Sequence, residues 1–281
     1  MHVFDTPGQM SAWSDAQRVA GRTVALVPTM GALHAGHLAL IELAHQHADV
    51  VVVSIFVNPL QFNRRDDFDA YPRPLTDDLV ACETAAVDAV YAPDADSMYP
   101  EGFDTHVEPG ELAAVLEGVL RPGHFRGVTT VVAKLFGATR PHVAMFGQKD
   151  FQQLAIIRRM ATDLDMGITI VGLPTLREPD GVAMSSRNRR LSPAQRAAAV
   201  CVPTALQAVA DAVAGGTTNS AALVAIGQAV VSAEPLARFE HLEVVDPHTM
   251  RALTEVRSNA LAVTAVWFGD VRLIDNRLLS T

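Results

Sequence analysis

The first two-thirds of the chain alternates short apolar runs with longer stretches in which apolar residues recur at helical spacing. The apolar runs predict strands at 24–27, 50–57, 88–92, 142–146 and 168–173. The amphipathic stretches predict helices at 11–20, 35–47, 75–87, 111–119, 128–138 and 151–164. The run at 50–57 (VVVVSIFV) is almost continuously apolar, which is typical of a parallel strand covered on both faces. We therefore expect an α/β fold built on a Rossmann-like parallel sheet.

The last third of the chain has a different order of elements. Ser192 and Gln195 form a capping box around Pro193, so a helix is expected to begin there. We expect helices at 193–213, with a break or new start near Pro203, and at 220–233, and strands at 241–245, 261–268 and 271–274. This pattern predicts a Rossmann-like nucleotide-binding domain at 1–187 and a smaller α+β C-terminal domain at 188–281.

The stretch 24–37, VALVPTMGALHAGH, runs from a strand through a turn into a helix that begins near Ala35. His34 and His37 lie at the helix start, where unpaired backbone amides and the helix dipole favour an anion. Gly36 adds no side chain that obstructs a ligand. We predict a phosphate site in which the imidazoles stabilise charge on a phosphoryl oxygen. Two surface histidines at a helix start are the plainer alternative.

Polar residues also follow two other predicted strands. Asn58 and Gln61 come directly after the strand at 50–57, where open α/β sheets bind ligands, although ordinary turn chemistry favours the same residue types. The segment from Gly147 to Asp150 (GQKD) repeats the layout of strand, glycine, polar residue and helix. It contains Lys149, one of only two lysines in the chain, at a place where a cation reaches phosphates.

Three further segments have two interpretations each. Met184 to Arg187 (MSSR) offers hydroxyls and a guanidinium, a suitable set for a polyphosphate, but it also fits a surface loop. Arg121 begins a glycine-rich loop at 121–127, either a lid that brings positive charge to a substrate or a solvated connector. Asp77 and Asp78 complement the dipole of their helix, and a magnesium role requires phosphates nearby.

The net charge and the cysteine content indicate which binding partners and which cellular compartment to expect. The net charge of -9, from 31 acidic and 22 basic residues, argues against a broad basic face for nucleic acid. Cys82 and Cys201 lie far apart in the sequence, which argues against a disulfide framework or zinc site and favours a reducing compartment. We see neither a cationic leader nor an apolar run of membrane-spanning length. We therefore expect a cytoplasmic protein without a membrane or nucleic-acid partner.

Five segments occur in a distinctive order: PTMGALHAGH, FVNPLQF, RPGHFRGVTTVVAKL, MFGQKDFQQL and AMSSRN. Together they resemble the pantothenate synthetase family, the pantoate:β-alanine ligases of the HIGH nucleotidyltransferase superfamily. The resemblance implies that ATP and pantoate give an enzyme-held pantoyl adenylate and pyrophosphate. Attack by β-alanine then gives pantothenate and AMP. The resemblance also suggests magnesium, a homodimer and a lid role for the domain at 188–281.

The resemblance assigns His37 as the active-site histidine, and Gln61 and Gln153 as residues that grip pantoate. Asn58 and Arg121 are further candidates for substrate binding because of their positions in the chain. The ATP-binding residues it implies are Pro28, Thr29, Met30, Gly31, His34, Gly36, His37, Gly147, Gln148, Lys149, Asp150, Leu176, Met184, Ser185, Ser186 and Arg187. Charge neutralisation in the reaction is expected from His34, His37, Lys149, Ser185, Ser186 and Arg187. Asp77 and Asp78 are the candidate magnesium ligands, acting together with the ATP phosphates.

The chemistry of an acyl adenylate agrees with this residue set. A carboxylate attacks the α-phosphorus of ATP, so the protein must position the reactants and neutralise charge rather than supply a nucleophile. Consistent with this, the sequence contains no GxSxG motif. Two alternatives stay open from the sequence. A nucleotidyltransferase acting on a phosphorylated acceptor would need more basic residues, and a non-catalytic nucleotide sensor would not need the hydroxyl and arginine loop.

Overall fold

The computed structural model describes residues 1–280, and the chain divides into two compact units. Unit 1 comprises Met1–Gln148 and Gln152–Leu173, and unit 2 comprises Lys149–Phe151 and the chain from Pro174 onward. This division after Leu173 differs from the boundary expected after residue 187. The physical reason is that the intervening loop bonds to the last strand of the chain, where Arg177 forms an ion pair with Asp275.

Unit 1 contains a six-stranded parallel sheet, which confirms the predicted Rossmann-like α/β class. Its strands are β1 (His2–Phe4), β2 (Val24–Thr29), β3 (Val50–Ile55), β4 (Ala89–Tyr91), β5 (Val143–Gly147) and β6 (Thr169–Leu173). Their spatial order is β1-β4-β3-β2-β5-β6, and every neighbouring pair is parallel. The short edge strand β1 was not expected, because three residues are too few to show a period.

The helices of unit 1 match the predicted ones in most positions. The long ones are α1 (Pro7–Val19), α2 (Ala35–His45), α4 (Leu75–Thr84), α7 (His124–Thr139) and α8 (Phe151–Asp163). The short ones are α3 (Arg65–Asp69), α5 (Ala95–Met98) and α6 (Glu117–Leu120), with 3-10 turns η1 (Pro59–Gln61), η2 (Glu111–Ala113) and η3 (Gln148–Asp150). The helix expected at 111–119 is wrong, because η2 and α6 occupy that stretch as separate pieces.

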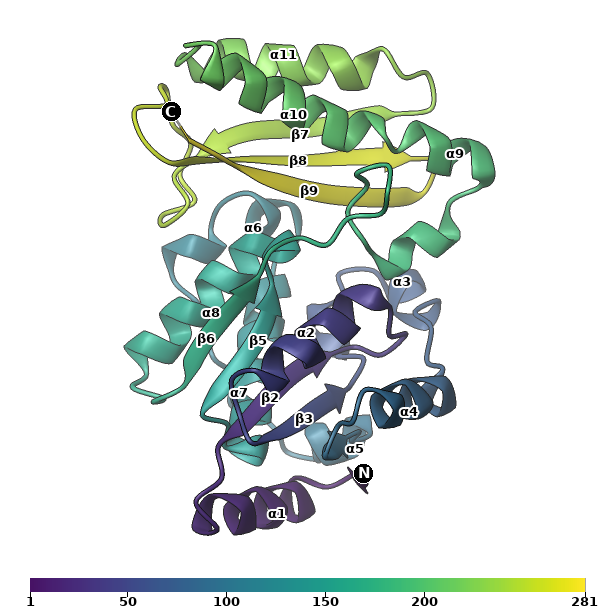
Figure 1. Cartoon of the computed structure of the whole chain (residues 1–281), viewed down its shortest axis with the longest axis vertical. Helices are drawn as coiled ribbons and strands as arrows, with labels where there is room; N and C mark the ends of the chain where they lie inside the picture. Colours follow the sequence, from purple (N-terminus) through teal and green to yellow (C-terminus); the bar gives the residue numbers. More distant parts are fainter. Residues whose placement is uncertain (281) are drawn as a thin grey trace. The chain divides into compact units, whose positions relative to one another are not determined.

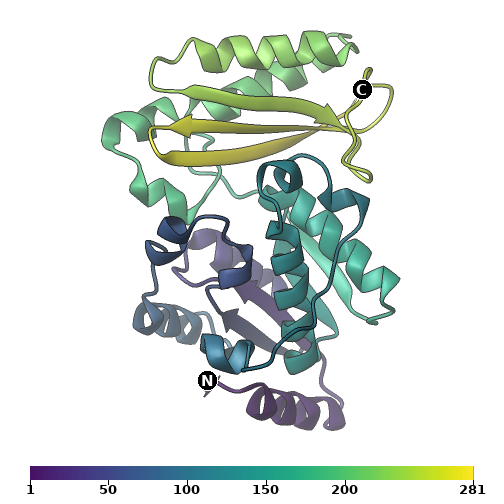
Figure 2. The ribbon, with the colours of Figure 1, turned by 180° about the vertical axis from the view of Figure 1, so that it is seen from behind.

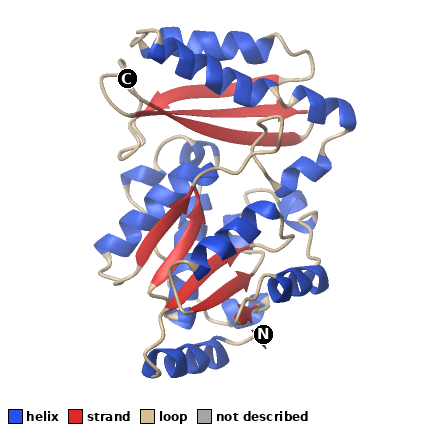
Figure 3. Ribbon diagram, in the orientation of Figure 1, coloured by secondary structure: helices blue, strands red, loops and turns tan. Residues whose placement is uncertain are grey.

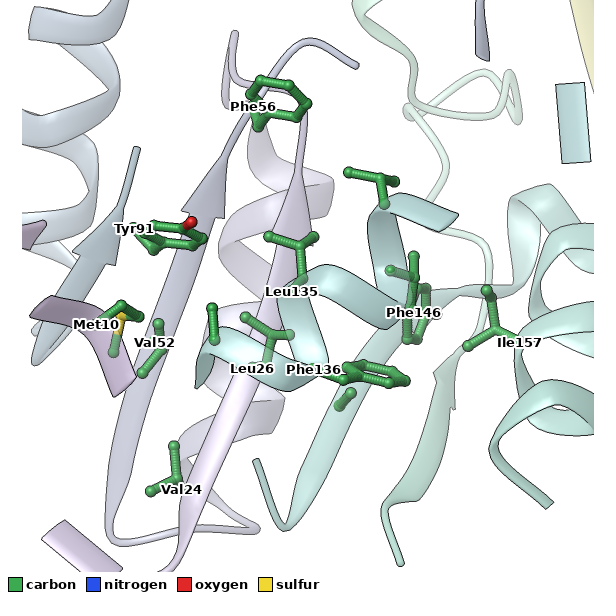
Figure 4. Packing of buried hydrophobic residues seen from close by; sticks show 14 of the residues in the cluster. Met10, Val24, Leu26, Val52, Phe56, Tyr91, Leu135, Phe136, Phe146 and Ile157 are labelled. Carbon is green, nitrogen blue, oxygen red and sulfur yellow. The ribbon is translucent and has the colours of Figure 1, made fainter. Parts of the chain in front are cut away.

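The sheet of unit 1 is buried on both faces, as its apolar strands predict. Val24 and Leu26 of β2 belong to one core cluster, and Ala25 and Val27 belong to the other. Helices α1, α7 and α8 pack into the first cluster, and α2 and α4 into the second. Figure 1 shows α2 in front of the strands, and Figure 2 shows α7 on the opposite face. Figure 4 shows the first cluster, with Phe136 of α7 against the strands.

The order of strands brings two predicted turns together. Strand β2 pairs with β3 on one side and with β5 on the other, so the chain changes direction across the sheet between β2 and β5. In open α/β sheets, ligands bind outside the carboxyl ends of the strands at such a point. The segment that begins at Met30 follows β2, and Gln148 follows β5. The topology therefore supports a ligand site at this edge.

Unit 2 is an antiparallel sheet with helices on one face (Figure 3). It contains η4 (Ser186–Arg190), α9 (Pro193–Ala198), α10 (Cys201–Ala214), α11 (Ser220–Ser232), β7 (Arg238–Val245), β8 (Ala260–Phe268) and β9 (Val271–Leu279). The strand order is β7-β8-β9, and both pairs are antiparallel. The predicted capping box is present, because Ser192 and Gln195 each bond the other's backbone N–H. The α+β class of this unit is therefore confirmed.

One helical stretch within residues 1–280, Pro193–Ala214, is long and apolar enough to cross a membrane by length and composition alone. It consists of α9 and α10, and α10 packs against β8 and β9. Val202 and Leu206 of α10 are buried in the core of unit 2. The core helix of a soluble protein meets the same criteria. The helical break precedes Pro203, which lies in the first turn of α10, where a missing N–H is tolerated.

Candidate active site

The turn that follows β2 is held by hydrogen bonds to its backbone. Thr29 Oγ1 accepts from Gly31 N–H at 3.1 Å. Asp78, buried in α4, accepts from Ala32 N–H at 2.8 Å and from Leu33 N–H at 2.7 Å. Gly31 has a φ of +81°, and a Cβ there would lie 2.9 Å from Asp78 Oδ2. The turn thus requires glycine for its conformation and for the space it leaves to Asp78.

His34 and His37 lie at the start of α2, where the sequence places them. The backbone of His34 is extended, with a φ of -142°, so His34 caps the helix. Its Nδ1 accepts from Gly36 N–H at 3.1 Å, and His37 Nδ1 accepts from His34 N–H at 3.4 Å. A neutral imidazole whose Nδ1 accepts a hydrogen bond carries its proton on Nε2. In this tautomer the Nε2 atom of each ring carries the proton, and the two ring centroids lie 4.1 Å apart.

Gly36 leaves space for the side chain of His34, which caps α2. A Cβ at this position would lie 2.9 Å from Cε1 of His34. The missing side chain thus makes room for the His34 ring, whereas the sequence suggested room for a ligand. The predicted helix start at Ala35 is confirmed.

Gln61 on η1 is oriented through both its side chain and its backbone. Its Oε1 accepts from Asn58 Nδ2 at 2.9 Å, and its Nε2 donates to Met30 Sδ at 3.3 Å. Its carbonyl oxygen accepts from His124 Nδ1 at 2.8 Å and from Arg121 Nη2 at 3.2 Å. Unit 1 therefore brings Met30, Asn58 and Gln61 together, as the strand ends predicted.

The loop expected at 121–127 is wrong over most of its length. His124 and the residues after it form the first turn of α7, and the guanidinium of Arg121 bonds the backbone of Gln61. A Cβ on Gly127 would lie 2.3 Å from Leu60 O, so this glycine permits close approach of α7 to η1. The structure gives the segment a scaffold role beneath Gln61, because glycine here serves helix packing.

The neighbours Gln152 and Gln153 have different environments. Gln152 is buried, and its Nε2 donates to Leu112 O and Val115 O, both at 2.8 Å. Its Oε1 accepts from Glu117 N–H at 3.1 Å. Gln153 is only half-buried. Gln152 therefore supports the fold, and Gln153 has the exposure that a substrate-binding residue needs.

Lys149 and the loop after β6 are held by consecutive residues of β9, all within unit 2. Asn276 Nδ2 donates to Lys149 O at 2.8 Å. Arg177 donates to Asp275 through two bonds, at 2.7 Å to Oδ2 and 3.0 Å to Oδ1. The Asp275 side chain is only 1% exposed, and it also accepts from Asn276 N–H at 2.8 Å. Strand β9 thus positions both predicted ATP segments of this unit.

The segment from Met184 to Arg187 is anchored at its start. Met184 N–H donates to Leu176 O at 2.9 Å, so these two predicted ATP-binding residues are neighbours. Ser185 caps η4, with its Oγ accepting from Arg187 N–H at 3.2 Å. Ser185, Ser186 and Arg187 are all half-buried. The hydroxyls and the guanidinium are therefore collected at the start of one short 3-10 helix, where the sequence predicted a loop.

Arg196 of α9 links two acidic residues of the same loop. Its Nη2 donates to Glu178 at 2.7 Å, and its Nη1 donates to Asp180 at 2.8 Å. Glu178 also accepts from Asn188 Nδ2 at 2.9 Å. The hydrogen bonds from Arg196 lower the pKa of Glu178 and of Asp180, and they raise the pKa of Arg196. This arrangement crosslinks the loop through charge.

The candidate magnesium ligands differ in exposure and in what they contact. Asp77 is exposed, whereas each oxygen of Asp78 accepts a backbone N–H of the turn after β2. Within residues 1–280, no group of three or more His, Cys, Asp or Glu side chains is arranged to hold a metal ion. Magnesium prefers octahedral oxygen coordination, so any ion here would depend on substrate phosphates for ligands.

The sequence profile of the pantoate-beta-alanine ligase family matches residues 2–278. The chain belongs to this family. The pantothenate synthetases of Geotalea uraniireducens and Roseiflexus castenholzii are 47% and 50% identical to it over 279 residues, which cover 99% of each chain. The resemblance seen in the five sequence segments is therefore confirmed.

Solved structures of the ligase family agree with this fold. The pantothenate synthetase of Thermus thermophilus superimposes with a TM-score of 0.92 at 42% identity, covering 99% of both chains. A pantoate-beta-alanine ligase of Francisella tularensis, solved with Beta-gamma ATP and β-alanine, gives a TM-score of 0.82 at 33% identity, covering 99% of this chain and 97% of that one.

Several residues of this ligase-family chain shape the site through contacts that the sequence did not predict. Asp78 anchors the turn after β2, and Asp275 and Asn276 anchor two segments of unit 2. Tyr99 and His124 bond the residues around Gln61. Each is distant in sequence from the segment it holds, so only the folded chain reveals the contact.

Proposed function

We propose that this chain catalyses the ATP-dependent condensation of pantoate with β-alanine through an acyl adenylate. A carboxylate oxygen of pantoate attacks the α-phosphorus of ATP, and the bond from that phosphorus to the bridging oxygen of the β-phosphate breaks. Pyrophosphate leaves with that oxygen. The amine of β-alanine then attacks the acyl carbon, the bond from the acyl carbon to the AMP oxygen breaks, and AMP leaves.

The observation that carries this proposal is that His34 and His37 lie at the N-terminus of α2, where the Nδ1 of each ring accepts a backbone N–H. A neutral ring bonded in this way carries its proton on Nε2 and is an N–H donor there. Such donors stabilise negative charge that builds on phosphate oxygens as the α-phosphorus is attacked. Neither imidazole needs to lose a proton for this role. Catalysis then consists of positioning and charge stabilisation, with the amide of Gln61 suited to the oxygens of pantoate.

One pair of assays tests the proposed reaction. With pantoate present and β-alanine absent, the protein should exchange labelled pyrophosphate into ATP, because adenylate formation is reversible. Addition of β-alanine should then release AMP and pantothenate in equal amounts. Exchange that needs no pantoate, or AMP release that needs no β-alanine, would rule out the ligase reaction in favour of another nucleotide chemistry.

Magnesium belongs to the proposal as part of the ATP substrate. The exposed carboxylate of Asp77 offers one oxygen donor group near the start of α4, and the phosphates of ATP supply others. Activity should therefore require magnesium at a concentration that matches ATP, and chelation should abolish it. Full activity in excess chelator would contradict a magnesium–ATP substrate.

A homodimer and a cytoplasmic location complete the proposal. The homodimer rests on the family resemblance, and sedimentation at micromolar concentration should give twice the chain mass of 30.1 kDa. The location is supported by Cys82 and Cys201, which are both free cysteines, because free thiols are usual in a reducing compartment. Cell fractionation tests the location directly.

A further inference from the structure

Tyr99 follows α5 and lies outside every segment that the sequence assigned to the site. Its hydroxyl donates to Asn58 Oδ1 at 2.7 Å. The ring packs against Phe56 and Phe103, with centroid distances of 6.0 and 4.9 Å. Burial raises the pKa of the Tyr99 hydroxyl, so this group stays a donor throughout the neutral range.

The amide of Asn58 has one allowed orientation. Leu60 N–H, which can only donate, bonds Oδ1 at 3.3 Å, and Gly127 O, which can only accept, bonds Nδ2 at 3.1 Å. The second hydrogen of Nδ2 bonds Gln61 Oε1, and the second lone pair of Oδ1 accepts from Tyr99. Asn58 is 1% exposed, and all four of its hydrogen-bonding positions are used within the protein.

This arrangement changes the expected role of Asn58. A fully bonded and buried amide has no position left for a substrate, so Asn58 acts on the substrate through Gln61. Because Asn58 holds Oε1 of Gln61, the opposite end of that amide, Nε2, is directed toward Met30. An N–H donor in a fixed place suits a carboxylate or hydroxyl oxygen of a small hydroxy acid.

We propose that Tyr99 is a positioning residue for pantoate, which orients the Gln61 amide through Asn58. This inference rests on the proposed function, because it requires that Gln61 bind pantoate. Without the Tyr99 hydroxyl, one lone pair of the buried Asn58 Oδ1 loses its partner, so the Asn58 amide and the Gln61 amide that it holds are fixed less firmly. Pantoate binding should weaken, whereas ATP, which depends on other segments, should bind as before.

The variant Tyr99→Phe removes only the hydroxyl and keeps the ring against Phe56 and Phe103. We expect the KM for pantoate to rise about fivefold to tenfold, as for loss of one buried hydrogen bond. The KM for ATP and kcat at saturating pantoate should change less than about twofold. These constants are measured by the release of AMP, with thermal unfolding recorded on the same samples.

Tyr91→Phe is the matched control. Tyr91 is 1% exposed in β4 (Figure 4), so this variant also removes a buried hydroxyl, but one that takes no part in the hydrogen bonds of the Asn58 and Gln61 side chains. It should leave the KM for pantoate unchanged. A second comparison places Tyr99→Phe in a Gln61→Ala background, where no amide is left to orient. In that background Tyr99→Phe should add nothing to the KM for pantoate.

Three results would overturn the inference. The KM for pantoate could stay at the wild-type value in Tyr99→Phe, the KM values for ATP and pantoate could rise together, or the two substitutions could act independently on the KM for pantoate. Failure of the proposed function has a different signature, because the wild-type protein itself would then show no pantoate-dependent exchange. That result removes the inference as well.

Discussion

The two units hold their candidate site residues by different kinds of bond. In unit 1, the histidine cap and Gln61 are set mainly by neutral groups, namely backbone amides, the Asn58 amide and glycines that permit close contact. In unit 2, the loop between β6 and α9 is held largely by ion pairs that involve Arg177 and Arg196. Short neutral contacts fix geometry closely, whereas charged crosslinks depend on the protonation of both partners.

Because the bonds differ, substitutions in the two units are expected to have different effects on catalysis and on stability. A residue of the histidine cap can be truncated with little effect on the fold, because the turn around it is held by Asp78 and Gly31. The loop after β6 is tied to β9 and α9 through charged side chains, so its ion pairs have a larger share in keeping it folded. Substitutions of His37 and Gln61 should therefore alter rates and KM values, and substitutions of the ion-paired residues of unit 2 should alter stability and its dependence on pH.

The largest expected effect is on the rate of adenylation in His37→Ala. Loss of one charge-stabilising donor should lower that rate about 100-fold or more, with near-normal thermal stability. Pantoate-dependent pyrophosphate exchange measures the rate. His47→Ala, an exposed histidine just after α2, is the control and should behave as wild type. If His37→Ala exchanged pyrophosphate at the wild-type rate, His37 would have no role in catalysis.

The second prediction concerns the buried ion pair of unit 2. Asp275→Asn leaves Arg177 without its carboxylate partner, and we expect a loss of about 3 kcal/mol in the free energy of unfolding. Asp270→Asn removes an acid that pairs with Arg190 at 3.1 Å but is 79% exposed, and should cost less than about 1 kcal/mol. Urea unfolding compares the two. Equal losses would show that burial does not distinguish these pairs.

The third prediction separates two roles of adjacent acids. Asp78→Asn replaces one acceptor oxygen with a donor that faces a backbone N–H, so it should cost about 2 kcal/mol in unfolding free energy and slow adenylation. Asp77→Asn should leave the stability unchanged. If Asp77 contacts magnesium, its variant alone should need more magnesium for half-maximal rate. A higher magnesium requirement in Asp78→Asn with normal stability would instead make Asp78 a ligand.

The smallest effect is expected for Arg196→Gln, about 1 kcal/mol near neutral pH, because its partners are partly exposed. Its bonds lower the pKa of Glu178 from 4.5 and that of Asp180 from 3.8, so their stabilisation is complete above those values. It is lost as the pH falls through the lowered values. The stability difference between wild type and variant should therefore be constant from pH 6 to 7 and shrink below about pH 4. A difference that does not vary with pH would exclude this charge mechanism.

Elements with a strong period were predictable from the sequence. Buried strands such as β3 and helices such as α8 show their period over many residues, and both match their predicted positions closely. The strand β1 and the pieces η2 and α6 were missed because local sequence determines such short elements weakly. Glycine residues in the segment at 121–127 suggest a loop from the sequence alone. Gly127 instead lies in α7, where its missing side chain lets the helix pack closely against η1.

The sequence by itself determined the class of fold and the family, and it indicated candidate segments for the site, because these depend on residue type and order along the chain. The tertiary structure decided how those segments are held. Asp78 holds the turn after β2, Tyr99 holds the side-chain amide of Asn58, and Asp275 holds the loop after β6. The residues in these contacts are 41 to 98 positions apart in the sequence. Hydrogen bonds form between atoms that folding brings within about 3 Å, and no local pattern records which distant residues those are.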